Sequence, residues 1–179
     1  EPHVVRIHDC GVTDDGLCYY VMEKLAGHTA SAEVRASGPL PPRRALAIAE
    51  QVARALVGVH AAGIVHRDLK PDNVMLTNVG GDHDFVKVID FGIARSAASR
   101  PDLTQAGTIV GTPAYMAPEQ ALGQPVEARA DVYALGATLY YMLTGRPPFV
   151  ASSATILLMS QIHDPALPPS VLVPELAPA

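Results

Sequence analysis

The residues best suited to chemistry lie in one short stretch, residues 66–73, with the sequence HRDLKPDN. Asp68 carries a carboxylate that can orient a hydroxyl group and accept its proton. Lys70 can bring a positive charge to a phosphate group, and Asn73 supplies an amide oxygen of the kind that magnesium binds. This combination suits phosphoryl transfer to a hydroxyl, a reaction that depends mainly on alignment and on the neutralisation of charge.

A second carboxylate, Asp90, follows the hydrophobic run at residues 85–89 and opens the sequence DFG. We expect residues 74–76 and 85–89 to form the two strands of a hairpin, because both runs are rich in apolar and β-branched side chains. Residues 80–84 are expected to form the polar turn between these strands. Such a hairpin would bring Asn73 and Asp90 to the same metal ion.

Composition sets only loose limits on function. The 179 residues, 49% of them hydrophobic and 17% charged, fit a globular chain with one core. A net charge of -5 gives no broad basic surface for nucleic acid or an anionic membrane. No apolar run approaches the roughly 18 residues of a spanning helix, and no signal peptide opens the chain. Cys10 and Cys18 are too few for a disulfide framework or a zinc site, and reduced thiols in a cytoplasmic protein are expected.

The combined motifs resemble those of the protein kinases. Residues 66–73 fit the pattern H-R-D-L-x-x-x-N, residues 90–92 are DFG, and residues 117–119 are APE, which closes a kinase activation segment. Lys70 and the sequence GTP at residues 111–113 resemble serine/threonine kinases rather than tyrosine kinases. The short connections look like the eukaryotic-type (Hanks-type) serine/threonine kinases of bacteria.

The resemblance implies an α+β, protein-kinase-like fold, present here as a partial catalytic domain. Residues 1–25 would be the last two strands of the small lobe and the hinge between lobes. Residues 26–179 would be most of a mainly helical large lobe, truncated before its last helices. The strand-forming runs at residues 4–8 and 18–23, joined by a turn rich in Asp and Gly, are expected to pair as a hairpin.

Three helices are expected to support these motifs. Residues 42–62 place apolar side chains at spacings of three and four, with proline at the start and Gly63 after the end. Residues 130–143 resemble the buried central helix of a kinase large lobe, in which Asp131 would bond backbone amides of the catalytic loop. A last helix is predicted at residues 154–162, after which prolines should prevent further regular structure.

The resemblance assigns catalytic roles by position. Asp68 would be the catalytic base, and Lys70 would contact the transferring phosphate of ATP. Asn73 and Asp90 would hold Mg2+, with Mn2+ as an alternative ion.

The same resemblance places the adenine of ATP at the hinge. Met22 would be the gatekeeper behind the ring, the Glu23 carbonyl and the Leu25 amide would bond its edge, and Met75 would lie beneath it. Ordinary core packing would explain Met22 equally well without its neighbouring motifs.

A hydrophobic stack joining the two lobes is also implied. His66 and Phe91 would belong to it, with Ile7 as the matching member from the small lobe. These residues would then serve packing and regulation rather than chemistry.

The segment between DFG and APE carries hydroxyls that a kinase could phosphorylate. Thr104 is favoured by position over Thr108, and Arg67 and Arg95 would be the positive partners of a phosphate there. Thr112 would hydrogen-bond near the catalytic base. The alternative is that these threonines are ordinary solvated loop residues.

The expected function is therefore ATP-dependent phosphorylation of serine or threonine in protein substrates, with self-association for autophosphorylation and no nucleic-acid partner. Two alternatives stay open. A truncated pseudokinase could act as a protein-binding module, although it would have no chemical need for the intact catalytic and metal residues. A small-molecule phosphotransferase of related fold would lack the APE sequence at residues 117–119.

The chain departs from the kinase pattern at its ends. It has no glycine-rich phosphate loop, no V-A-x-K lysine and no helix with the glutamate that pairs with that lysine. It opens on Glu1 rather than Met, which indicates either a processed chain or a piece of a longer protein. We therefore expect these residues alone to have little or no phosphotransferase activity.

Overall fold

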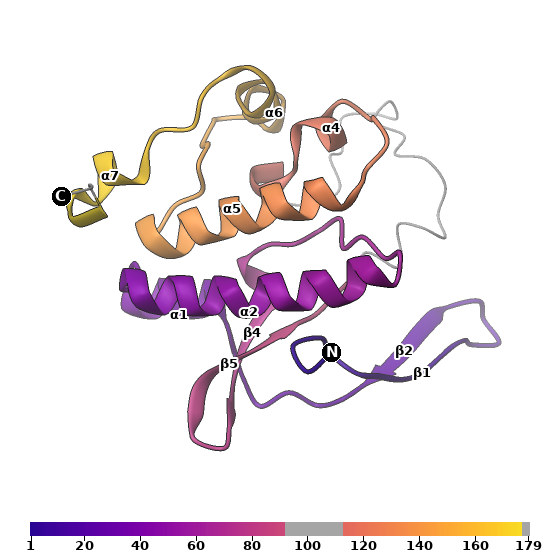
Figure 1. Cartoon of the computed structure of the whole chain (residues 1–179). Helices are drawn as coiled ribbons and strands as arrows, with labels where there is room; N and C mark the ends of the chain where they lie inside the picture. The colour runs from indigo at the N-terminus through magenta and orange to yellow at the C-terminus, as the bar shows by residue number, and fades with distance from the viewer. Residues whose placement is uncertain (92–112, 177–179) are drawn as a thin grey trace.

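The computed structural model describes residues 1–91 and 113–176, and their architecture is α+β, as the sequence predicted. Two long helices, α2 (Pro42–Ala61) and α5 (Ala128–Thr144), pack against each other at its centre. Figure 1 shows α2 between α5 on one side and a small sheet on the other. The two helices and the sheet enclose the main hydrophobic core.

Helix α2 forms where its apolar spacing predicted it. Ile48, Val52, Leu56 and Val59 recur every three or four residues and are all buried. Proline at the first helical position lacks only an N–H that would have no partner within the helix.

Helix α5 ends at Gly145, which has a φ of 76°. Glycine adopts this left-handed conformation at little steric cost, so it closes the helix that carries Asp131. The N–H of Gly145 donates to the Tyr141 carbonyl at 2.8 Å.

The sheet next to α2 has three antiparallel strands in the order β3 (Gly27–Thr29), β4 (Val74–Val79) and β5 (Asp82–Val88). Val86 and Val88 on β5 are fully buried, because that strand contacts α2. Strands β4 and β5 confirm the predicted hairpin.

The expected turn at residues 80–84 is shorter than predicted. Gly80 and Gly81 both have positive φ, at 61° and 93°, which allows a two-residue connection. Strand β5 therefore begins at Asp82, and Asp84 lies in the strand rather than in a turn.

A second sheet consists only of β1 (Ile7–Val12) and β2 (Cys18–Met22), which pair with each other in antiparallel register. The first strand starts later than predicted. Val4 instead forms a parallel bridge with Val88, and the Val5 N–H donates to the Val88 carbonyl at 3.0 Å. Val5 is buried and Val4 is half-buried against β5, which accounts for the difference, since the hairpin itself offers no buried face.

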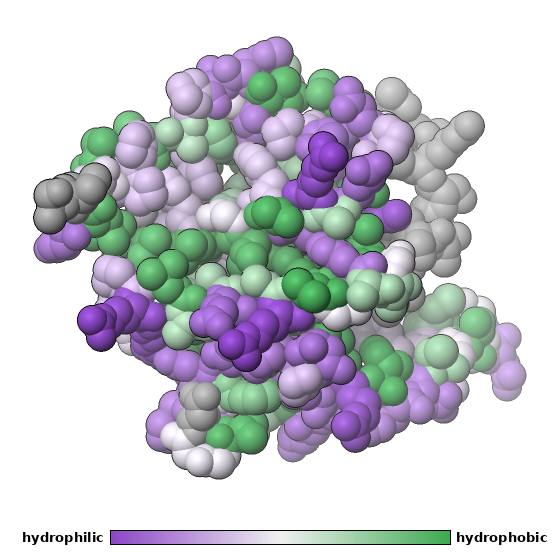
Figure 2. Space-filling model, in the orientation of Figure 1, coloured by the Kyte–Doolittle hydropathy of each residue, from purple (hydrophilic) through white to green (hydrophobic). Residues whose placement is uncertain are grey.

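The β1–β2 hairpin is exposed along nearly its whole length. Val12 and Leu17, at its outer end, are 64% and 65% exposed. In Figure 2 apolar residues are visible on this projecting hairpin as well as between the central helices.

The remaining elements are short. Helix α1 (Ala30–Ser37), which the sequence analysis did not identify, begins where the Thr29 hydroxyl accepts from the Ala32 N–H at 3.0 Å. Helix α6 (Ala154–His163) matches the predicted last helix within a residue. The other short elements are η1 (Pro71–Asn73), η2 (Pro113–Tyr115), α4 (Pro118–Ala121), α7 (Pro169–Leu172) and η3 (Pro174–Leu176).

Helix α7 and the turn η3 contradict the prediction that prolines prevent regular structure after α6. Both begin with a proline, at Pro169 and Pro174. Proline is compatible with the first turn of a helix, where its missing N–H costs nothing.

Within residues 1–91 and 113–176, no helix combines the length and the apolar character that a bilayer crossing requires.

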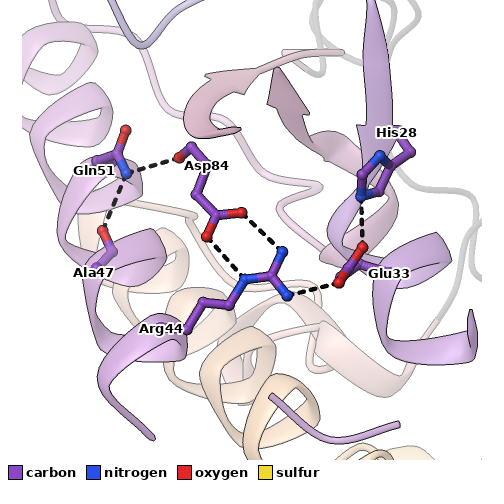
Figure 3. Close-up of polar contacts among 6 residues, drawn as sticks. All are labelled: His28, Glu33, Arg44, Ala47, Gln51 and Asp84. Atoms are coloured by element: carbon purple, nitrogen blue, oxygen red, sulfur yellow. Dashed lines mark hydrogen bonds and ion pairs between the residues drawn. The ribbon is translucent and has the colours of Figure 1, made fainter. Parts of the chain in front are cut away.

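A polar network centred on Arg44 connects four elements (Figure 3). Its guanidinium donates to both carboxylate oxygens of Asp84 on β5, at 2.8 and 2.9 Å, and to Glu33 on α1 at 2.6 Å. His28 on β3 contacts the other oxygen of Glu33 at 2.7 Å. Gln51, which lies about two turns after Arg44 on α2, donates its side-chain N–H to the Asp84 backbone carbonyl at 3.0 Å. The network therefore fixes α1 and β5 against α2.

These contacts favour the charged forms of the groups involved. Hydrogen bonding to Arg44 lowers the pKa of Asp84 and of Glu33 below their ordinary values. Both carboxylates bind their proton less readily in the folded chain than in the unfolded one, so they contribute stability that is present at neutral pH and lost in acid.

We expect Arg44→Met to lower the free energy of unfolding by about 1–3 kcal/mol at pH 7, because the partly buried carboxylates of Glu33 and Asp84 both lose their contacts with the Arg44 guanidinium. The difference from wild type should shrink below about pH 4, where the carboxylates of the wild type become protonated. Urea unfolding at several pH values measures both effects. The control is Arg54→Met, which breaks an exposed pair with Glu50 and should cost less than about 0.5 kcal/mol. A loss for Arg44→Met that stays constant down to pH 3 would contradict this account.

Candidate active site

The predicted catalytic residues meet at one side of a loop between α2 and η1. Lys70 Nζ lies 2.9 Å from Asp68 Oδ2. Asn73 Nδ2 donates to the Asp68 backbone carbonyl at 2.8 Å. Asp68 and Lys70 are half-buried, whereas Asn73 is 4% exposed. The Asp68 carboxylate and the Lys70 ammonium group are therefore partly accessible to solvent, and the Asn73 amide beside them is buried.

The backbone of this loop is held by Asp131 of α5, as the sequence analysis expected. Asp131 is 1% exposed. Its Oδ2 accepts from the His66 N–H at 2.8 Å, and its Oδ1 accepts from the Arg67 N–H at 2.9 Å. His60 Nε2 lies 2.7 Å from the same Oδ2. A buried carboxylate needs such donors, since burial without them costs several kcal/mol.

The backbone of Arg67 adopts an unfavourable conformation in this loop. Its φ is 65°, in the left-handed region that a residue with a Cβ enters at a cost of roughly 1–3 kcal/mol. The hydrogen bond from its N–H to Asp131 offsets part of that cost. The peptide geometry of the catalytic loop therefore depends on a side chain from a helix that lies far along the chain.

His66 connects the catalytic loop to the segment that carries Asp90. Its Nε2 lies 3.0 Å from the Ile89 carbonyl, and its Nδ1 accepts from the Asp68 N–H at 3.3 Å. Burial lowers the pKa of His66, so the ring is neutral at physiological pH and carries its proton on Nε2. The ring also contacts Phe91 at a centroid distance of 4.6 Å.

The His66–Phe91 contact agrees with the stack that the sequence suggested. Ile7, the expected third member, lies in the exposed strand β1 and is 40% exposed. Within the described residues the stack is seen only between the catalytic loop and Phe91.

Asn73 and Asp90 lie at the same end of the β4–β5 hairpin. Val74 pairs with Val88, and the Ile89 N–H donates to the Asn73 carbonyl at 3.0 Å. Asp90 follows directly with a φ of 56°. The hairpin thus brings together two residues that are well separated along the chain, as predicted.

The donor atoms at this end of the hairpin fit a hard divalent cation. Asp90 is exposed and offers carboxylate oxygens, and Asn73 offers its amide oxygen because its Nδ2 is used by the Asp68 carbonyl. Oxygen ligands of this kind suit Mg2+. Tyr20 donates its hydroxyl to Asp90 Oδ1 at 2.9 Å, a contact that the sequence analysis missed.

Three of the residues predicted for adenine lie where β2 ends and the chain leads into β3. Met22 ends β2 and is 41% exposed, and Leu25 is half-buried. Met75 on β4 is directly opposite Lys87 on β5, so the two side chains share one face of the sheet. Glu23 contacts Lys87 at 2.7 Å, which brings the predicted hinge to the face that carries Met75.

Four predicted regulatory residues lie outside the described part of the chain: Arg95, Thr104, Thr108 and Thr112. Arg67, which together with Arg95 was expected to attract a phosphate on Thr104 or Thr108, has an exposed side chain.

Helix α4, which contains Glu119 of the APE sequence, is joined to the catalytic loop by Gln120. Its Nε2 donates to the Arg67 carbonyl at 2.9 Å, and its Oε1 accepts from the Ala117 N–H at 3.1 Å. Sequence reasoning did not identify this residue. The only signal for it is its place directly after APE, which gives no information about a partner so far along the chain.

Taken as chemistry, the site offers one carboxylate to accept a proton, one cation beside it, and two oxygen-bearing side chains for a metal. It holds them with buried hydrogen bonds from α5 and from the β4–β5 hairpin. This arrangement suits the transfer of a charged group to a hydroxyl.

Comparisons with known proteins agree with this chemistry. The family model described as "Protein kinase domain" matches residues 1–172. The chain is 47% identical to the serine/threonine-protein kinase PknD of Mycobacterium tuberculosis, over 99% of this chain and 26% of that protein. It is 48% identical to the serine/threonine-protein kinase Pkn1 of Myxococcus xanthus, over 99% of this chain and 25% of that protein.

Solved structures with the same fold include the kinase domain of Mycobacterium tuberculosis PknI, with a TM-score of 0.71 and 31% identity, over 99% of this chain and 59% of that one. Rad53 (residues 1-466) in complex with AMP-PNP matches with a TM-score of 0.78 and 28% identity, over 99% of this chain and 43% of that one. The chain spans about a quarter of the length of the curated relatives it matches.

We expect Asp131→Asn to lower the free energy of unfolding by about 2–4 kcal/mol, because an amide NH2 in place of one oxygen would face a backbone N–H in a buried site. Urea unfolding measures the loss. The matched control is Asp72→Asn, an exposed carboxylate of the same loop, which should change stability by less than about 0.5 kcal/mol. Equal stability of the Asp131→Asn variant and wild type would show that the loop does not depend on this carboxylate.

Proposed function

The chain belongs to the protein kinase family, among its serine/threonine kinases of bacterial type, and on this premise we propose that the protein in which it naturally occurs transfers the γ-phosphoryl group of ATP to serine or threonine hydroxyls of proteins. The observation that carries the proposal is the contact between Lys70 and Asp68, with Asn73 bonded to the same residue. These groups lie on one loop, and Asp90 lies at the adjacent hairpin end.

In this proposal Asp68 acts on the incoming hydroxyl. Its carboxylate accepts the hydroxyl proton while the oxygen attacks the γ-phosphorus, and the bond from that phosphorus to the bridging oxygen of ADP breaks. Lys70, 2.9 Å from the carboxylate, is close enough to contact the transferring phosphate as well.

The metal role falls to Asn73 and Asp90. Magnesium, or manganese in its place, would neutralise charge on the phosphates when bound. The protein's part is to hold the two oxygen-bearing side chains at one end of the β4–β5 hairpin, which the bond between the Ile89 N–H and the Asn73 carbonyl favours.

The adenine of ATP would lie between the hinge and the sheet. Met22 would limit the depth of the pocket, the Glu23 carbonyl and Leu25 amide would bond the edge of the ring, and Met75 would pack beneath it. Glu23, Leu25 and Met75 are each half-buried and thus partly accessible, which supports this assignment.

Control of activity would come from phosphorylation of Thr104, with Thr108 as the second candidate. A phosphate there would attract Arg67 and Arg95 and order the segment through charge-assisted hydrogen bonds. Transfer between two copies of the protein would supply the phosphate. Thr112 would hydrogen-bond near Asp68 and Lys70.

We expect Asp68→Asn to lower kcat by about 10²- to 10⁴-fold and to leave ATP affinity nearly unchanged, because the base acts only in the transition state. The assay follows labelled phosphate from ATP to a protein substrate, in the protein in which this chain naturally occurs. Asp164→Asn, an exposed carboxylate at the end of α6, is the control and should have wild-type kcat. Wild-type turnover by the Asp68→Asn variant would remove Asp68 from the proposed role.

We expect Thr104→Ala to lower kcat after incubation with ATP, because the phosphate that would order the segment cannot form. Parallel measurement of Thr108→Ala, with mass spectrometry of the phosphorylated sites, separates the two hydroxyls. Full activity of Thr104→Ala with loss in Thr108→Ala would move the switch to Thr108. Full activity of both variants would remove this mode of control.

A further inference from the structure

A half-buried ion pair connects the predicted hinge to strand β5 of the three-stranded sheet. Lys87 Nζ on β5 lies 2.7 Å from Glu23 Oε1, with the two side chains 16% and 28% exposed. The same Glu23 oxygen accepts from the Arg6 N–H at 2.8 Å. One carboxylate oxygen therefore receives two donors, from segments that are far apart in the sequence.

These contacts lie at the base of the β1–β2 hairpin. Arg6 directly precedes β1 and Glu23 directly follows β2, and the Glu23 N–H donates to the Arg6 carbonyl at 3.0 Å. Lys87 Nζ also lies 3.4 Å from the Val4 carbonyl. A single lysine of the large lobe thus contacts both the chain that enters the hairpin and the chain that leaves it.

Little apolar burial is available to fix the hairpin itself, since both of its strands are exposed. An isolated two-stranded hairpin is marginal in water, so polar contacts at its base have a large share in its orientation. The bond to Lys87 lowers the pKa of Glu23, which keeps the carboxylate charged at neutral pH.

We propose that Lys87 is a positioning residue for the nucleotide: through the Glu23 carboxylate it holds the hinge backbone over the face of the sheet that carries Met75. Met75 and Lys87 are directly opposed on β4 and β5, so their side chains share that face. The inference rests on the proposed function, in which the Glu23 carbonyl and Met75 both contact adenine.

The kinetic consequence follows from what the hinge would touch. Adenine lies away from the reacting phosphorus, so its contacts are equally strong in the ground state and in the transition state. Loss of hinge positioning therefore weakens nucleotide binding and raises KM for ATP, while kcat stays the same. A role limited to overall stability would not separate the two constants in this way.

The test is a double-mutant cycle in the protein in which this chain naturally occurs. Lys87→Met, Glu23→Gln and the double variant are titrated with a non-hydrolysable ATP analogue by calorimetry, and their kcat and KM are measured beside it. Each single change is expected to weaken analogue binding by about three- to tenfold. The double variant is expected to bind no more weakly than the worse single variant, because both changes remove the same interaction.

Two further variants separate positioning from charge and from folding. Lys24→Met removes an equal charge from the exposed residue beside Glu23 and is expected to keep wild-type affinity. Lys87→Arg keeps a donor and is expected to restore most of the affinity. Melting temperatures identify any variant that fails to fold, in which case Lys87→Arg and Glu23→Gln decide the question.

Unchanged affinity in a folded Lys87→Met variant would overturn the inference, as would additive losses in the double variant, an equal loss in Lys24→Met, or a fall in kcat at constant KM. Absence of nucleotide binding by the wild-type protein would instead overturn the proposed function together with the inference.

Discussion

Two hydrogen bonds, donated by successive backbone amides to one buried carboxylate, determine the geometry of the site. Asp131 accepts from the N–H groups of His66 and Arg67, the two residues just before Asp68. The bonds require α5 to pack closely against α2, which ends just before the loop. The position of the loop therefore depends on the packing of the two helices. A shift of α5 would move the Asp131 carboxylate and, with it, the two amides that it holds.

His66 connects this loop to the segment around Asp90. Its backbone is fixed by Asp131, and its neutral ring reaches the Ile89 carbonyl and packs on Phe91. The two residues around Asp90 are thus held by the same side chain whose backbone orders the catalytic loop. Both Arg67 and Asp90 have positive φ, a conformation costing roughly 1–3 kcal/mol for a residue with a Cβ. Such strain is retained where surrounding hydrogen bonds and packing hold the backbone in place. The two strained positions are the residue just before Asp68, and Asp90 itself.

Features that depend on residues close together in the sequence could be predicted, whereas those that depend on distant residues mostly could not. Helix α2 and the β4–β5 hairpin were predictable because local periodicity reflects which face is buried. The role of Asp131 came only through a resemblance, since nothing local links a helix residue to a distant loop. Helix α1 was missed because it is short and weakly apolar, and the turn before β5 was overestimated because polar residues also occur in an exposed strand.

Three other side-chain contacts between distant segments were not predicted. Gln120 at the Arg67 carbonyl, Tyr20 at Asp90 and Lys87 at Glu23 join segments that no spacing rule connects.

These missed contacts divide the site into two regions of different rigidity. The residues with catalytic and metal assignments rest on the core formed by α2, α5 and the sheet, where burial opposes movement. The hairpin that leads into the segment with the proposed adenine contacts has no such core, and its placement depends on a few polar contacts, chiefly the Glu23–Lys87 pair and the Tyr20–Asp90 bond. Both contacts reach the same end of β5, because Lys87 lies in that strand and Asp90 follows two residues after the strand ends. Substitutions at the base of the hairpin should therefore affect nucleotide contacts first, while the alignment of the catalytic loop, which Asp131 holds independently, stays intact.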